Sequence, residues 1–544
     1  MRHAQAVFHC TLVLLLTTMV ACVGEMPPPP LLEVTSPQRG MVRGEASRVT
    51  VQGRALPSPN GDRVAKVTVN KTPATLAADG SFTAVVDLPP GAMLLETVAI
   101  TEEGGSATDA RAVQVGELRA VGTKIEKAVT ATLSADAFAK LSAAAGPLIK
   151  AADLSAMLAP LQPIASLGDS LANLKLSITT LSLGTPTIKL IPVDGGLEFS
   201  AEIGPLSFAA NAAYGGTLVP DGTTAVSVNA DKITISGKLV VTPAGTAGFT
   251  TRIAMPNVKA TGLRLQASGL AGRVLALMND NLGSTVNTIT TRSAELALQP
   301  VLNTALGALG GTQHIDVLGK MLSIQASPAA ITFTRAGALV TIDLQATISG
   351  SESSPGYIYT PNGTPTLNVS NGVQLALADD LINQLLAEVH ALGLLDIHLQ
   401  EDFGLFDTAD IRLAMPPMVS ANTTDGSMRL VLGDMIATFT DNGKTVISAA
   451  INASVELEIE RGTKAEEIAL QFGKIHVFVN ILGDPAENTA SDLTGAASAG
   501  IALQLDSLSQ FLISVPLPSV AGVQLDNLAL RADSGYVVVS GKIH

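Results

Sequence analysis

Alternation of apolar and polar residues with a period of two runs through most of this 544-residue chain and constrains its fold more than any other feature. Stretches such as "NLKLSITTLSL" and "KITISGKLVV" show it, and Gly, Pro and Asp separate them. Such alternation is typical of strands with one buried face, and the separating residues are typical of turns. We therefore expect a mainly β protein built from antiparallel sheets.

Two segments replace this alternation with helical spacing. Between residues 269 and 309 apolar side chains recur every three or four positions, which predicts a long amphipathic helix with one apolar stripe. The stretch "GVQLALADDLINQLLAEVHALGLL" predicts a second helix. Residues 130–165 are rich in Ala and Leu and contain three prolines, which indicates shorter helical pieces. The expected fold class is therefore α+β, mainly β with long helices.

The N-terminal part of the chain predicts a separate small domain. Residues 31–116 contain short alternating strands with closely spaced turns, as in an antiparallel β-sandwich. The stretch "VTVNKTPATLAADGSFTAVVDLPPGAMLLETVAITEEGG" resembles bacterial Ig-like modules. Further on, residues 349–372 are rich in Ser, Pro, Gly and Asn, which predicts a linker.

The first residues, "MRHAQAVFHCTLVLLLTTMVAC", predict a secretory signal, with a basic start, an apolar stretch and small residues at the end. Their close, "MVAC", resembles a bacterial lipobox, which implies a signal peptide at residues 1–21 and lipidation of Cys22. Residues 22–30 then form a Pro-rich spacer. This predicts a lipoprotein secreted across the inner membrane to the outer membrane, on its periplasmic or cell-surface face. The alternative is an ordinary signal peptide with an incidental cysteine.

Composition argues against several classes of function. Acidic residues outnumber basic ones by 47 to 33, and the Lys and Arg residues are scattered, which disfavours nucleic acid as a partner. No G-x-S-x-G, H-E-x-x-H, phosphate-loop or dinucleotide pattern occurs, so we expect no enzyme and no cofactor. Four histidines are dispersed, which disfavours a metal site: His314, His390, His398 and His476.

The apolar residues are too abundant for an ordinary soluble chain. They make up 47% of the sequence, and the mean hydropathy is +0.38. After residue 22 no run of about 18 apolar residues appears, so the surplus does not predict spanning helices. It favours an apolar cavity instead.

The order of these segments from about residue 120 to the end resembles the bactericidal/permeability-increasing protein and lipopolysaccharide-binding protein family, of the tubular lipid-binding superfamily. The resemblance is carried by "KITISGKLVV", by the helix with "LQPVLN" near its end, by the second helix, and by the closing "VPLPSVAGVQLDNLALRADSGYVVVSGKIH". It implies two tandem elongated barrels at 120–348 and 373–544, each a bent antiparallel sheet wrapped around a long helix. Acyl chains of a phospholipid or other lipid would lie between helix and sheet.

The residues expected to line these crevices lie on the apolar stripes of the two helices. They are Leu270, Val274, Leu277, Met278 and Leu282 in the first half, and Leu381, Leu385, Leu386 and Val389 in the second. For each residue the alternative is that it fills a dry core. The expected function is lipid binding or transfer at the cell envelope by a membrane-anchored lipoprotein. One alternative is an adhesion or structural protein in which the Ig-like module binds glycan or protein and the barrels are a scaffold. Another is an outer-membrane assembly or scaffold partner.

Overall fold

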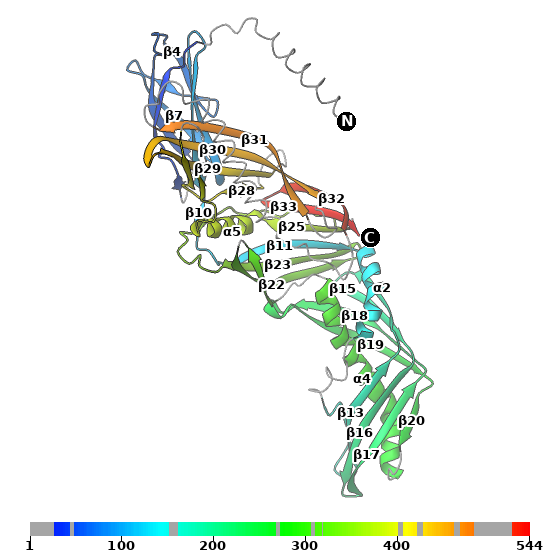
Figure 1. The fold of residues 1–544 in the computed structure, drawn as a ribbon. Coiled ribbons are helices and arrows are strands. Elements are labelled where there is room, and N and C mark those ends of the chain that lie inside the picture. The colour runs from blue at the N-terminus through cyan, green and yellow to red at the C-terminus, as the bar shows by residue number, and fades with distance from the viewer. Residues whose placement is uncertain are drawn as a thin grey trace, which may run out of the picture.

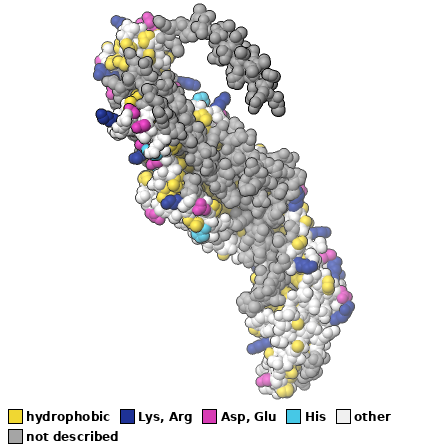
Figure 2. Space-filling model, in the orientation of Figure 1, with side chains coloured by type: hydrophobic (Ala, Val, Ile, Leu, Met, Phe, Trp, Pro, Cys, Tyr) yellow, Lys and Arg dark blue, Asp and Glu magenta, His cyan; other side chains and the backbone are white. Residues whose placement is uncertain are grey.

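A computed structural model describes residues 27–43, 48–151, 162–267, 272–305, 311–317, 319–370, 372–400, 406–421, 428–461, 468–482 and 525–543. These residues form an elongated molecule, with the N-terminal strands at one end and the strands of residues 165–267 at the other (Figure 1). On the face shown in Figure 2, charged side chains of both signs are interspersed over the described surface. Among the described residues, no helix combines the length and hydropathy that a bilayer crossing requires.

Two sheets with their own apolar core form the N-terminal end. In β3 (Arg48–Leu56) every second side chain is buried, as the alternation predicts. The first sheet has the order β1 (Leu31–Ser36), β3, β7 (Ser81–Asp87), β6 (Thr75–Leu76). The second has the order β2 (Met41–Arg43), β9 (Ser106–Val115), β8 (Gly91–Thr101), β4 (Val64–Val69), β5 (Thr72–Pro73). The β2–β9 pair is parallel, so this sandwich is not purely antiparallel.

A seven-stranded central sheet joins the two halves of the rest of the chain. Its order is β21 (Gly311–Val317), β22 (Lys320–Thr334), β23 (Gly337–Ile348), β11 (Ile125–Ser134), β25 (Val373–Ala378), β33 (Tyr536–Ile543), β32 (Leu525–Asp533). In β11, Ala131 pairs with Val340 on one side and with Leu375 on the other. β32 and β33 form a C-terminal hairpin at one edge of this shared sheet.

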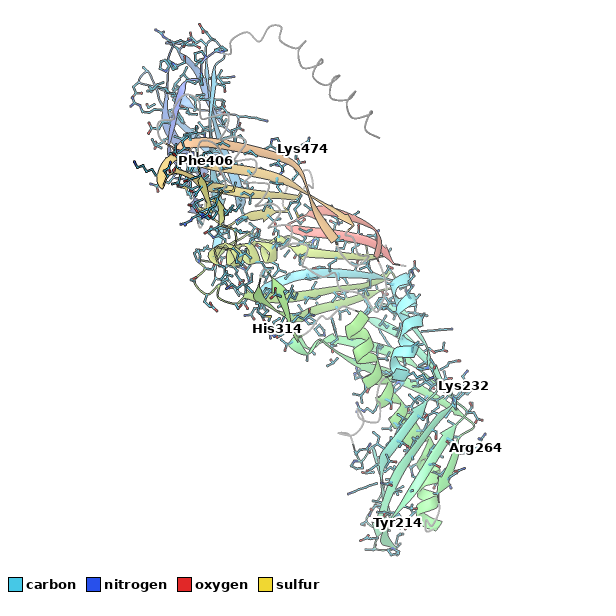
Figure 3. The ribbon with its side chains drawn as sticks, in the orientation of Figure 1. Tyr214, Lys232, Arg264, His314, Phe406 and Lys474 are labelled. Atoms are coloured by element: carbon cyan, nitrogen blue, oxygen red, sulfur yellow. The ribbon has the colours of Figure 1, made fainter. Side chains whose placement is uncertain are left out.

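The first half continues as a meander of four long strands, each bent near its middle. The bends divide the meander into two sheets that follow each other along the strands. One sheet has the order β12 (Ala165–Gly168), β13 (Asn173–Leu183), β16 (Leu206–Gly216), β17 (Val219–Ala230), β20 (Arg264–Ala267). The other has the order β14 (Thr187–Val193), β15 (Gly196–Ile203), β18 (Lys232–Pro243), β19 (Phe249–Thr261). Tyr214 lies near the far end of this meander, whereas Lys232 and Arg264 lie closer to its middle, just after the bends at Asp231 and Gly262 (Figure 3).

Glycines explain where the meander bends. A Cβ at Gly184 would come within 2.0 Å of the carbonyl oxygen of Gly204, and one at Gly204 within 2.7 Å of that of Asp231. Gly262 has a φ of +64° and lies against the Asp231 side chain. Such close approach leaves no room for a Cβ, and glycine adopts a positive φ at the lowest steric cost. The four bends therefore line up across the sheet.

The second half has one large sheet and a short helix. The sheet has the order β26 (Ile397–Gln400), β27 (Thr408–Leu413), β29 (Met428–Asp441), β30 (Lys444–Arg461), β31 (Ile468–Leu482), and β28 (Met418–Ser420) also pairs with β29. The helix is α5 (Asp379–Ala391). Within the segment expected as a linker, β24 (Tyr357–Tyr359) pairs with β10 (Glu117–Arg119).

The expected fold class is wrong. About 63% of the described residues are in strands and about 13% in helices, so this part of the chain is mainly β rather than α+β with long helices wrapped by sheets. The described helices are α2 (Ala135–Ala151), α4 (Gly272–Ala305), α5 and the short 3-10 turn η2 (Gly245–Ala247). The physical reasons are local. Glycine bends split the long strands into separate sheets, and the second expected helix ends after 13 residues, followed by Gly393 with φ +66°.

Candidate functional site: an apolar crevice along α4

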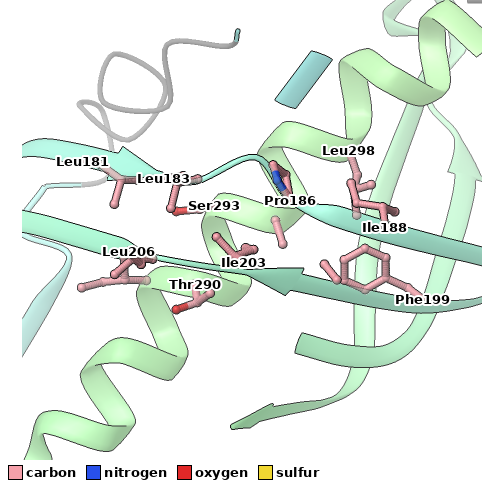
Figure 4. A pocket seen from close by; sticks show the side chains of 13 residues that line it. Leu181, Leu183, Pro186, Ile188, Phe199, Ile203, Leu206, Thr290, Ser293 and Leu298 are labelled. Carbon is pink, nitrogen blue, oxygen red and sulfur yellow. The ribbon is translucent and has the colours of Figure 1, made fainter. Parts of the chain in front are cut away.

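Two pockets lie between α4 and the bent meander. The first, here called the bend pocket, sits where β13 and β16 meet β14 and β15. Its cavity volume is about 20 Å³, within about 440 Å³ of unfilled space that includes open solvent. Its strand side is formed by Leu181, Leu183, Ile188, Phe199, Ile203 and Leu206. Its helix side is formed by Ile289, Thr290, Ser293, Ala294 and Leu298. Figure 4 shows these strands crossing α4 around the pocket.

The bend of the sheet makes room for this pocket. The chain leaves β13 at Gly184 and enters β16 after Gly204 and Pro205, and the Gly184 N–H donates a hydrogen bond to the Pro205 carbonyl at 2.8 Å. The strand formed by β13 and β14 and the neighbouring strand formed by β15 and β16 thus bend side by side. The apolar side chains on either side of the bend, such as Leu183 and Ile188, diverge around space that α4 covers only in part.

A second pocket, the sheet pocket, continues the crevice toward the N-terminus of α4. Its cavity volume is about 10 Å³, within about 270 Å³ of unfilled space that includes open solvent. It is lined by Leu167, Leu176, Phe208, Val226, Val228, Leu282 and Thr285. Leu206 of the bend pocket and Phe208 of the sheet pocket are two residues apart on β16, so they point to the same face of the strand. The two pockets are therefore neighbours along one helix.

The expected residues of the first helix are only partly placed. Leu270 lies outside the described residues, and the side chains of Leu277 and Met278 are not described. Val274 is fully buried, and Leu282 lines the sheet pocket. Most of the described lining on α4 lies further along the helix, from Thr285 to Leu298.

Sequence reasoning missed the hydroxyl residues of the crevice. Thr285 and Ser293 are buried in the pocket walls, and Ile289 lies between them at a spacing of four residues. That spacing places all three on one face of a helix. The signal was available in the sequence, but a stripe defined by apolar residues alone excludes Thr and Ser.

The expected residues of the second helix are all buried. Leu381, Leu385, Leu386 and Val389 are at most 6% exposed and belong to the main hydrophobic core. The polar residues of α5 are buried too, which its amphipathic sequence does not predict. They are Asp379, Asp380, Asn383, Gln384 and Glu388.

These polar side chains of α5 bind backbone groups of surrounding segments. The Asn383 side chain accepts a hydrogen bond from the Val419 N–H at 2.7 Å and donates one to the Val419 carbonyl at 3.0 Å. The Gln384 side chain donates to the Ala346 carbonyl at 2.6 Å. The Glu388 carboxylate accepts from the Ile348 N–H and from the Ser351 hydroxyl. The apolar side chains of α5 pack in the core and its polar side chains hydrogen-bond to other segments. We therefore interpret this helix as a structural element.

A pair of buried carboxyl groups opens α5. Asp379 accepts a hydrogen bond from the Ala421 N–H at 3.0 Å, and Asp380 accepts one from the Thr360 N–H at 2.9 Å and one from the Asn362 amide at 3.1 Å. Burial raises the pKa of Asp379 to about 7 and that of Asp380 to about 6. The pair ties the start of α5 to the segments around it.

Another buried carboxylate joins the N-terminal sandwich to the large sheet of the second half. Asp434, whose side chain is 0% exposed, pairs with Arg39 at 3.0 Å. It also accepts hydrogen bonds from the Gly40 N–H at 2.7 Å, the Ala112 N–H at 3.2 Å and the Asn452 amide at 3.1 Å. Among the described residues, no group of three or more His, Cys, Asp or Glu side chains could hold a metal ion.

Comparison with known proteins finds distant structural likeness only. No family model and no curated protein matches the sequence. Among solved structures, the crystal structure of lipopolysaccharide binding protein is similar at 14% identity, covering 77% of this chain and 99% of that chain with a TM-score of 0.36. P47 of Clostridium botulinum E1 is 8% identical, and the match covers 76% of this chain and 98% of that chain with a TM-score of 0.23. The solution structure of latherin is 14% identical, and the match covers 32% of this chain and 85% of that chain with a TM-score of 0.19. TM-scores below 0.5 do not establish a shared arrangement or a shared function.

Proposed function

We propose that this protein binds lipid acyl chains in the crevice between α4 and the bent meander. The observation that supports this most directly is the pair of neighbouring pockets with almost entirely aliphatic and aromatic walls. Each methylene group moved from water into such surroundings contributes about 0.8 kcal/mol. The enclosed cavities are about 20 and 10 Å³, so an alkyl chain lying along α4 would enter by moving the apolar side chains of the pocket walls apart.

The ligand class is a phospholipid or another acyl lipid, and the process is binding or transfer. Relative to a bilayer, the gain from burying methylene groups nearly cancels, because the chain is already in an apolar medium. A partly open crevice of this kind suits exchange of lipid between membranes better than extraction against a gradient. Selectivity then depends on the few polar groups that face the crevice.

We further propose that Cys22 carries a lipid anchor that holds the protein at the outer membrane. The sequence before Cys22 supports this, since it resembles a lipoprotein signal, and Cys22 itself lies outside the described residues. The Pro-rich residues after it would act as a stiff spacer. The N-terminal sandwich would then stand between the membrane and the crevice-bearing half of the chain.

Filling the bend pocket tests the proposed function. Ala294 is half-buried and lines this pocket, so Ala294→Phe places an aromatic ring in the empty space. Lipid extracted from the purified wild-type protein and counted by mass spectrometry should exceed that from the variant several-fold. Ser284→Phe is the matched control, because Ser284 is an exposed residue of the same helix. Equal lipid content in all three proteins, or none in any, contradicts the proposal.

A further inference from the structure

Two buried hydroxyl groups in the crevice have no hydrogen-bond partner. Thr285 is 4% exposed and lines the sheet pocket, and Ser293 is 7% exposed and lines the bend pocket. Neither the Thr285 Oγ1 nor the Ser293 Oγ makes a hydrogen bond within the described part of the chain. A buried hydroxyl without a partner destabilises a folded protein, so two of them along one wall require an explanation.

Other hydroxyl residues of α4 show the usual solution. The Thr288 Oγ1 donates to the Ser284 carbonyl at 3.0 Å, and the Thr290 Oγ1 donates to the Val286 carbonyl. Such bonds to the carbonyl four residues earlier satisfy Ser and Thr in helices. Thr285 and Ser293 face the pockets instead. Their unpaired hydroxyls are covered from solvent in the pocket walls, so a molecule that enters the crevice reaches them by displacing neighbouring wall atoms.

The two hydroxyls are placed so that one extended ligand can reach both. Eight residues separate Thr285 from Ser293, which corresponds to about 12 Å along the helix axis at a rise of 1.5 Å per residue. Both pockets open on the same side of the meander, and Leu206 and Phe208 connect them along β16. An alkyl chain that runs along α4 therefore passes the two hydroxyls in turn.

We propose that the crevice selects acyl chains that carry a hydroxyl group along the chain over unsubstituted chains of the same length. This inference rests on the proposed function and adds the class of lipid. A hydroxyl on the ligand both donates and accepts, so it can pair with the Ser293 or Thr285 side chain in the apolar wall. An unsubstituted chain leaves the protein hydroxyl unpaired, and a misplaced ligand hydroxyl loses its water without gaining a partner.

The test compares octadecanoic acid with monohydroxyoctadecanoic acids that differ only in the position of the hydroxyl. Each competes with a fluorescent fatty acid for the full-length protein. At least one hydroxy acid should bind the wild-type protein roughly three- to tenfold more tightly than octadecanoic acid, as expected for one net hydrogen bond. In Ser293→Ala or Thr285→Val that preference should disappear while octadecanoic acid still binds.

Control variants separate this effect from general changes in the helix. Ser284→Ala and Thr288→Val remove exposed hydroxyls of α4 and should keep the wild-type preference. Ser293→Ala should also raise the thermal unfolding midpoint of the lipid-free protein, since it removes an unpaired buried hydroxyl. If all hydroxy acids bind no better than octadecanoic acid, the selectivity is refuted and lipid binding stands. If no fatty acid binds, both proposals are refuted.

Discussion

Replacing Asp434 by Ala should release the N-terminal sandwich from the rest of the protein. The Asp434 carboxylate is fully buried and accepts hydrogen bonds from Arg39, two backbone N–H groups and Asn452. Removing it leaves the two N–H groups without that acceptor and takes away one of the two carboxylates that pair with Arg39, the other being Asp109 at 2.9 Å. Breaking a buried ion pair by removing one partner costs about 3–5 kcal/mol.

Calorimetry and limited proteolysis measure the outcome. The variant should unfold in two separated transitions, with the sandwich first, and proteases should cut between residues 116 and 125 faster than in the wild-type protein. Asp434→Asn keeps one acceptor oxygen and should have a smaller effect. The control is Asp87→Ala, which removes an ion pair with Arg48 in which the side chains are 81% and 70% exposed. Such exposed pairs contribute at most about 1 kcal/mol. If Asp434→Ala lowers the unfolding midpoint no more than Asp87→Ala does, Asp434 does not hold the N-terminal sandwich to the large sheet of the second half.

Two further predictions concern the buried core of the second half. Burial raises the pKa of Asp379 to about 7 and of Asp380 to about 6, so folding favours their protonated forms. The resulting stability is present at low pH and lost as the pH rises from about 4 to about 7, and Asp379→Asn should flatten this decline in the unfolding midpoint. A midpoint that rises with pH over this window would contradict the assignment. Deleting residues 525–544 removes β33 from β25, including the Leu375–Val539 pairing, and should cause aggregation on expression. A soluble protein that still binds lipid after this deletion would refute the role given to the hairpin.

Elements with a clear local signal could be predicted from the sequence. The strand alternation of β3 and the long helical stripe around α4 follow from the spacing of apolar residues. The C-terminal hairpin follows from "RADSGYVVVSGKI", in which Ser534 and Gly535 form the turn with positive φ. These features depend only on residues close together in the sequence, so the local sequence pattern is sufficient to predict them.

Features that depend on distant partners could not be predicted in this way. Asp379, Asp380 and Glu388 look like the solvent-facing residues of an amphipathic helix, but backbone groups of other segments bind them inside the core. The bend of the meander depends on glycines that approach each other across strands, which periodicity does not show. The hydroxyls of the crevice were missed because their role depends on having no partner within the protein.

Photocrosslinking would test lipid binding in the α4 crevice most directly. A fatty acid with a photoactivatable group near the end of its chain is bound to the wild-type protein, crosslinked by light and located by peptide mass spectrometry. We expect adducts on α4 between Thr285 and Leu298 and on the facing strands β13 to β16. Adducts concentrated on α5 or on the N-terminal sandwich, or spread evenly over the chain, would contradict it.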